Sequence, residues 1–131
     1  MYPELPRYVN GHPMGYVRDW ADMDELTTAQ ALRAVRFIHD SAGKDKPFFL
    51  YLATSMPHVP LGASSDFKGK FATPYADTLA DIDRAVGAVM KALRDKEVDR
   101  ETLVIFSSDN GPWLNFGRHA GSAGQIGRAH V

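Results

Sequence analysis

The chain has 131 residues, of which 44% are hydrophobic and 24% are charged, a balance typical of a globular domain and incompatible with general disorder. Fifteen basic residues against 16 acidic residues give a net charge of -1, so no global field favours nucleic acid or an anionic membrane as a partner. The sequence has no cysteine, which excludes disulfides and thiolate zinc sites, and no apolar run approaches the ~20 residues of a membrane span.

The first half of the chain predicts a loop and then a helix. The first 25 residues contain three prolines and no clear periodicity, which indicates a chain that begins inside a loop of something larger. From Ala31 to Ile38 apolar residues recur on one helical face, which predicts a helix that begins at Thr27 or Thr28 and stops at Gly43.

Two strands and a second helix are expected after this. Residues 48–53, FFLYLA, form an apolar run too short for a typical helix, which predicts a strand covered on both faces. Residues 54–71 read as an irregular loop. An apolar stripe from Tyr75 to Leu93, with steps of four and three residues, predicts the second helix, and residues 102–108 predict a second buried strand.

This order of elements is typical of an α/β fold. Two strands joined through a crossover helix are expected to be parallel, with the helices covering the sheet. In such sheets the carboxyl ends of the strands carry the ligand site. The loop after the first strand is MPHVP and the loop after the second is SDNGPW. We therefore expect a functional site where these two loops meet.

The residues of these loops allow more than one interpretation. Asp109 and Asn110 offer one charged and one neutral oxygen, the ligand type that Mg²⁺ and Ca²⁺ accept. Asp-Asn-Gly is also a common turn in which the aspartate caps its own backbone, and the tripeptide alone favours this turn. His58 lies between two prolines, where it could donate to an anionic substrate or simply be solvated. Trp113 is expected in the core.

Taken together, these pieces resemble the sulfatase family. The resemblance covers residues 45–124 through KPFFLYLA, PHVP, YADTLADIDRAVGAVMKAL, TLVIFSSDNGP and HAGSAG, and the combination of SSDNGP with PHVP is its most specific part. It implies an incomplete part of a three-layer, alkaline-phosphatase-like sandwich. It also implies a sulfuric ester hydrolase, in which a formylglycine attacks a sulfate ester beside a divalent metal, usually Ca²⁺. By this resemblance Asp109 and Asn110 are metal ligands, and His58 is a catalytic and substrate-binding residue that hydrogen-bonds a sulfate or leaving oxygen.

The sequence also departs from the family pattern. The nucleophile motif C/S-x-P-x-R, the paired aspartates of the first strand and the GKWH-type segment are absent, so the formylglycine is expected in the parent protein and not in this chain. Calcium takes about six to eight oxygen ligands, so we expect this chain alone to bind metal poorly and to hydrolyse nothing. We expect residues 1–124 to be a partial sulfatase catalytic domain and residues 125–131, QIGRAHV, to be a non-native tail.

The expected partners follow from the same resemblance. They are a sulfate-ester small molecule or a sulfated glycan, together with the rest of the catalytic domain, with no nucleic acid and no membrane span. Family habit implies a periplasmic, secreted or lysosomal parent. Two alternatives stay open: a related phosphodiesterase or phosphonate hydrolase, and a non-catalytic α/β interaction module in which the DNG corner is merely a turn.

Overall fold

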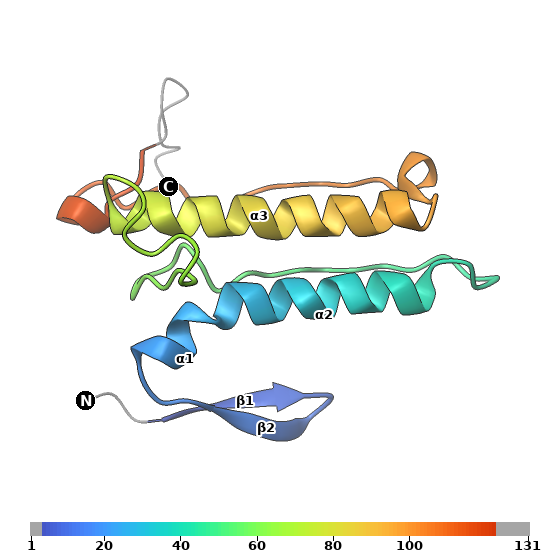
Figure 1. Cartoon of the computed structure of the whole chain (residues 1–131), viewed down its shortest axis with the longest axis horizontal. Coiled ribbons are helices and arrows are strands. Elements are labelled where there is room, and N and C mark those ends of the chain that lie inside the picture. Colours follow the sequence, from blue (N-terminus) through green and yellow to red (C-terminus); the bar gives the residue numbers. More distant parts are fainter. Residues whose placement is uncertain (1–3, 123–131) are drawn as a thin grey trace.

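The computed structural model of the chain describes residues 4–122 (Figure 1). In chain order its elements are β1 (Leu5–Val9), β2 (His12–Val17), α1 (Trp20–Asp24), α2 (Leu26–Ser41), α3 (Pro74–Asp95) and the two short 3-10 helices η1 (Asp99–Glu101) and η2 (Gly117–His119). None of the helices between residues 4 and 122 has the length and apolar character of a membrane span. The predicted tail, residues 125–131, lies outside the described residues.

The two long helices confirm the periodicity of the sequence. Helix α3 begins as a capped helix should, because the Thr73 side chain accepts a hydrogen bond from the Ala76 amide at 3.1 Å and Pro74 occupies the first helical turn. Helix α2 starts at Leu26, slightly earlier than predicted, directly after α1. It ends just before Gly43, whose φ of +83° is the left-handed conformation that follows many helices.

The core lies where α2 and α3 pack side by side (Figure 1). Ile38 of α2 meets Ala92 and Leu93 of α3, and each of these side chains is at most 2% exposed. The half-buried residues packed around this centre are Val35, Phe48, Leu50, Val89, Met90 and Val98. Because Phe48 and Leu50 belong to the first predicted strand, that segment is fixed along the helix pair.

The two predicted strands are extended segments, but neither is a strand among the described residues, so that prediction was wrong here. Residues 48–53 run along α2 and residues 102–108 run along α3, both from right to left in Figure 1. A strand requires backbone hydrogen bonds to a neighbour. Within residues 4–122, no backbone hydrogen bond joins these segments to each other or to another segment.

The first extended segment is covered on one face only, and the second is more exposed still, so neither is covered on both faces as predicted. From residue 48 to residue 54 half-buried and exposed positions alternate strictly, which is the side-chain period of a strand. The outward row includes Phe49, which is 85% exposed, and Tyr51, which is 79% exposed. Along α3, Leu103 and Ile105 are 85% and 78% exposed. Residues 48–53 therefore have the side-chain pattern of a strand with one open face, whereas residues 103–108 are exposed at every position.

The amino-terminal region is a hairpin where a loop was predicted. Strands β1 and β2 pair antiparallel, with Leu5 opposite Val17 and Val9 opposite His12. Asn10 and Gly11 connect them with φ values of 52° and 80°, the left-handed pair that a tight hairpin turn requires. The described residues thus combine helices with strands, as expected for a mixed α/β chain, but this sheet is antiparallel.

Candidate functional site

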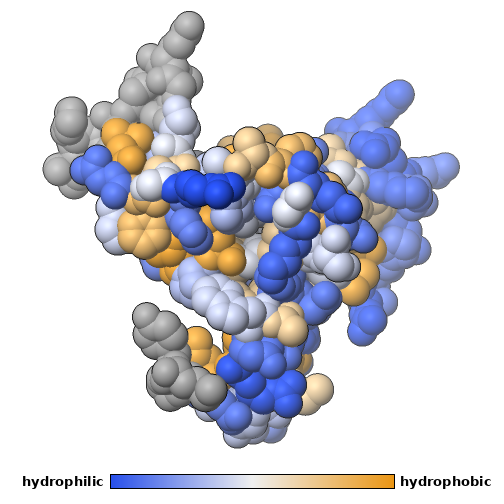
Figure 2. Space-filling model, turned by 60° about the vertical axis from the view of Figure 1, so that its left-hand side comes forward, coloured by the Kyte–Doolittle hydropathy of each residue, from blue (hydrophilic) through white to orange (hydrophobic). Residues whose placement is uncertain are grey.

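The loops that follow the two extended segments meet in one open pocket of about 500 Å³. His58 lines it from the first loop, and Asp109 and Asn110 line it from the second. Tyr75, at the start of α3, contributes to the wall between them. Figure 2 brings this end of the molecule forward and shows apolar and polar surface interleaved there. The expected meeting of the two loops is confirmed, although their residues' chemical roles stay predictions.

The loop before His58 is anchored to α2 and to itself. The Gln30 amide of α2 donates to the Ser55 hydroxyl at 3.0 Å, and the Ser55 backbone N–H donates to Gln30 Oε1 at 3.3 Å. The Thr54 hydroxyl donates to the Met56 carbonyl at 2.8 Å. Met56 is 3% exposed, and its sulfur accepts a hydrogen bond from the Gly62 amide. The backbone on either side of His58 is therefore fixed by the scaffold.

One nitrogen of the His58 ring is already engaged. Nδ1 lies 2.6 Å from the Val59 carbonyl oxygen. Since a carbonyl can only accept, this contact requires the proton on Nδ1. The ring is exposed at the pocket, and Nε2 is then the nitrogen available to a ligand.

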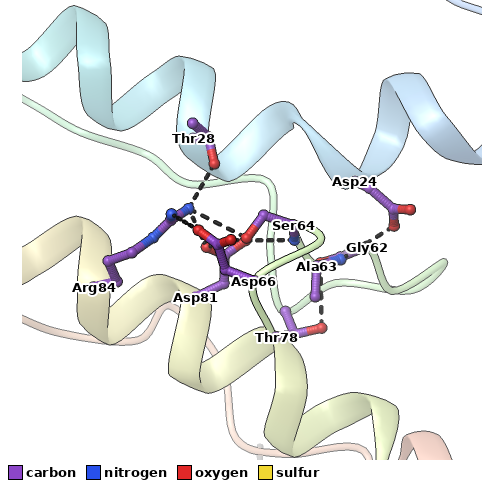
Figure 3. A network of polar contacts seen from close by, with 9 residues as sticks. All are labelled: Asp24, Thr28, Gly62, Ala63, Ser64, Asp66, Thr78, Asp81 and Arg84. Atoms are coloured by element: carbon purple, nitrogen blue, oxygen red, sulfur yellow. Dashed lines mark hydrogen bonds and ion pairs between the residues drawn. The ribbon is translucent and has the colours of Figure 1, made fainter. Parts of the chain in front are cut away.

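A buried polar network holds the next part of the same loop (Figure 3). Asp81 of α3 is fully buried and accepts hydrogen bonds from the Ser64 amide at 2.9 Å, the Ser64 hydroxyl at 3.1 Å and Arg84 at 2.6 Å. Arg84 also donates to Thr28 of α2 at 2.7 Å and to Asp66 of the loop at 2.9 Å. The network therefore ties α2, α3 and the loop to one another.

Two further carboxylates bind backbone amides of this loop. Asp77, which is 5% exposed, accepts from the Gly69 amide at 2.9 Å and the Phe71 amide at 2.8 Å. Asp24, at the end of α1, accepts from the Ala63 amide at 3.2 Å. Asp77 and Asp81 lie off the apolar stripe that runs from Tyr75 to Leu93, and no sequence pattern indicates that they are buried. Their contacts are with the loop and not with the pocket, so they support the site from outside.

The DNG corner bends at Asp109 and Asn110, and serine hydroxyls hold it. The Ser108 hydroxyl donates to the Asn110 carbonyl at 2.7 Å, and the Ser107 hydroxyl donates to the Ser108 carbonyl at 3.2 Å. The alternative interpretation required the Asp109 side chain to cap its own backbone. No such hydrogen bond is present within residues 4–122. In the part of the chain that the structure describes, no hydrogen bond or ion pair engages the side chain of Asp109 or Asn110, and both residues line the pocket.

These oxygens fit a divalent cation in kind but not in number. A carboxylate and an amide are hard oxygen donors, as Ca²⁺ and Mg²⁺ prefer. Among residues 4–122, however, no three His, Asp or Glu side chains are grouped so that they could hold a metal ion. Further ligands would have to come from outside the described residues.

The far side of the pocket is aromatic. Trp113 was predicted in the core, but it is 56% exposed and lines the pocket, so that prediction was wrong. Its ring stacks on Phe116 with centroids 4.4 Å apart and planes at 22°, and Phe116 meets His119 edge-on at 5.9 Å. No sequence pattern had singled out His119, which lines the pocket as well.

Comparison with known proteins gives a consistent result. The sulfatase family model matches residues 2–129. Arylsulfatase A of Homo sapiens is 40% identical over 85 residues, which are 61% of this chain and 17% of that protein. N-acetylgalactosamine-6-sulfatase of Mus musculus is 33% identical over 109 residues, 82% of this chain and 20% of that protein. Arylsulfatase G of Canis lupus familiaris is 30% identical over 123 residues, 92% of this chain and 22% of that protein.

A solved structure is similar as well. The crystal structure of Ps i-CgsB in complex with k-i-k-neocarrahexaose has a TM-score of 0.51 and 34% sequence identity, over 55% of this chain and 18% of that chain. The present chain spans about a fifth of the length of the curated relatives described above, between 17% and 22% of each.

Proposed function

The chain belongs to the sulfatase family, and from this premise we propose that residues 1–124 are part of the catalytic domain of a metal-dependent sulfatase that hydrolyses sulfate esters. We propose in addition that residues 48–53 and 102–108 are parallel strands of a three-layer, alkaline-phosphatase-like sandwich in the full-length protein. The shared direction of the two segments, the alternating exposure of residues 48–54 and the lack, within residues 4–122, of backbone hydrogen bonds from either segment to a neighbouring one support this arrangement.

The observation that carries the proposal is the meeting of two distant loops in one pocket. His58 comes from the first loop, and Asp109 and Asn110 come from the second. A sulfate ester has no proton to lose, so its negative charge must be neutralised before a nucleophile can approach. An imidazole on one side, and a cation held by the hard oxygens on the other, are suited to that task.

Asp109 and Asn110 would hold the metal, most suitably Ca²⁺. When bound, the cation would supply the neutralisation of the sulfate charge. The support is that, within residues 4–122, no hydrogen bond or ion pair engages these two side chains, while serine hydroxyls hold the corner. Since the other ligands and the formylglycine nucleophile are not in this sequence, this chain alone would bind metal weakly and hydrolyse nothing.

His58 would act on the substrate through Nε2. With Nδ1 bonded to the Val59 carbonyl, a protonated ring can donate from Nε2 to a sulfate oxygen or to the leaving oxygen. The substrate would be a small sulfate ester or a sulfated glycan. The N-acetylgalactosamine-6-sulfatases and the neocarrahexaose complex among the similar proteins favour the glycan.

The test uses the full-length protein and the variant Asp109→Ala. We expect hydrolysis of aryl sulfates in preference to aryl phosphates, loss of bound calcium in the variant and a fall in turnover of at least about 100-fold. Asp99→Ala, an exposed aspartate on η1, is the matched control and should change neither quantity.

Two outcomes would contradict the proposal. A preference for phosphate esters would favour a phosphodiesterase or phosphonate hydrolase. Unchanged calcium content and turnover in Asp109→Ala would favour a non-catalytic module.

A further inference from the structure

We propose that Trp113 and Phe116 form a stacking platform for one sugar ring of the substrate, so that this pocket takes a sulfated glycan and not merely a small sulfate ester. The inference rests on the proposed function, because it places the sugar beside the site assigned to the sulfate group. It adds a binding role to Trp113, which was predicted in the core.

The platform lies beside the proposed metal ligands. Trp113 follows Asn110 by three positions and lines the same pocket. One face of its ring stacks on Phe116, with the ring centroids 4.4 Å apart, and the Phe116 ring packs edge-on against His119. With 56% of Trp113 exposed, the indole is held in place while a large part of its surface stays open.

The loop that carries the platform is also packed closely against the scaffold. A Cβ atom added to Gly121 would lie 2.7 Å from the ring of Tyr75 and 2.9 Å from Pro112, so this backbone passes where no side chain fits. Arg118 donates to the Ala72 carbonyl at 3.2 Å and so joins the loop to the segment before α3. The aromatic pair is therefore positioned relative to the pocket before any ligand arrives.

The chemistry of an aromatic face favours a sugar ring over a sulfate group. A pyranose has an apolar face of C–H groups that packs on a ring, whereas the negative face of an indole disfavours an anion. The sulfate would then lie toward His58 and the metal ligands, and the sugar ring would lie on Trp113. Because Trp113 is 56% exposed, the platform also leaves room for neighbouring sugars of a longer chain.

Other exposed aromatic side chains do not share this setting. Phe49 and Tyr51 are more exposed than Trp113, but they lie on the outward row of an extended segment and are not among the residues that line the pocket. That row suits coverage by another layer of the full-length protein. Trp113 and Phe116 form a supported stack of which Trp113 lines the candidate site.

The experiment compares three variants of the full-length protein. They are Trp113→Ala, Trp113→Phe and Trp20→Ala, the last being the matched control because Trp20 is 61% exposed on α1 and does not line the pocket. The substrates are k-i-k-neocarrahexaose, a chondroitin 6-sulfate hexasaccharide and 4-nitrophenyl sulfate. We expect Trp113→Ala to raise KM for a hydrolysed hexasaccharide about tenfold more than for 4-nitrophenyl sulfate. Trp113→Phe should recover most of this loss, and Trp20→Ala should match the wild type.

Equal effects on both substrate types, or no effect, would overturn the platform, because a residue with only a structural role does not distinguish sugars from aryl groups. If the wild-type protein hydrolyses no sulfate ester, the proposed function fails and a binding measurement decides the platform. Saturation-transfer NMR with the desulfated hexasaccharides should then show sugar signals with the wild type and with Trp20→Ala, but not with Trp113→Ala. A wild type that gives no such signal would also overturn the inference.

Discussion

Removing the buried carboxylate of Asp81 should destabilise the protein more than removing any exposed carboxylate of the same helix. In Asp81→Ala, the Ser64 amide and hydroxyl lose their acceptor. Ser64 is 5% exposed, so water replaces the lost bonds poorly. A buried polar group left without a partner costs about 1–3 kcal/mol.

The charge of Arg84 adds a smaller contribution. Breaking a fully buried ion pair costs about 3–5 kcal/mol. The Arg84 side chain is 37% exposed and keeps its contact with Asp66, so solvent and that neighbour compensate for most of the lost charge pairing. We therefore expect Asp81→Ala to lower the free energy of unfolding by about 2–4 kcal/mol.

The assay is urea unfolding of the full-length protein at neutral pH, followed by helical circular dichroism. Asp81→Asn keeps an oxygen that can accept from the Ser64 amide and should lose less stability than Asp81→Ala. Asp95→Ala removes an exposed partner of Lys91 on the same helix and should have little measurable effect. If Asp81→Ala costs less than about 1 kcal/mol, or no more than Asp95→Ala, the network does not anchor the loop as described.

Two further predictions concern the loop that carries His58. Gln30→Ala removes both hydrogen bonds to Ser55, so it should misplace His58 and lower kcat/KM for a sulfate ester about tenfold, with little loss of stability. Arg33→Ala, a substitution at an exposed position of the same helix, serves as the control. Equal kinetics in the two variants would contradict the positioning role of Gln30. Gly62→Ala would place its Cβ 2.8 Å from a backbone carbonyl oxygen of α1 and should destabilise the protein by about 1–3 kcal/mol. Gly87→Ala, with open space around it on α3, should stabilise the protein by about 0.5–1 kcal/mol. The same urea unfolding assay measures both changes. If both glycine variants changed the free energy of unfolding in the same direction, the close approach at Gly62 would be contradicted.

The helices could be predicted because their signals are local. The stripe from Tyr75 to Leu93 and the stop at Gly43 depend on residues within a few turns of one another. The hairpin signal was equally local, since Asn10-Gly11 is a typical turn pair, but the neighbouring prolines led to the prediction of a loop.

The strands and the buried carboxylates could not be predicted because they depend on distant chain. An apolar run becomes a strand only beside another strand, and none lies next to residues 48–53 or 102–108 among the described residues. Asp81 looks like a solvated helix residue until the loop containing Ser64 folds back over it. Burial of that kind is set by tertiary packing, which helical periodicity does not describe.

The position of the candidate site could be predicted from the direction of the two extended segments. Strand direction placed His58 and Asp109 at one end of the molecule, and the structure brings them to one pocket. The exposure of Trp113 could not be predicted, because it depends on the path of the loop up to Gly121. The backbone at Gly121 lies close against Tyr75, and no residue pattern specifies this contact.

The outward rows of the two extended segments determine how this stretch behaves apart from its larger protein. Phe49 and Tyr51 on one segment and Leu103 and Ile105 on the other present apolar side chains next to backbone groups that have no partner within residues 4–122. We expect this combination to recruit other copies into intermolecular sheets. Lysine at these four positions would repel such copies and should keep this stretch in solution when it is produced alone. In the full-length protein the same lysines are expected to prevent assembly of the proposed sheet.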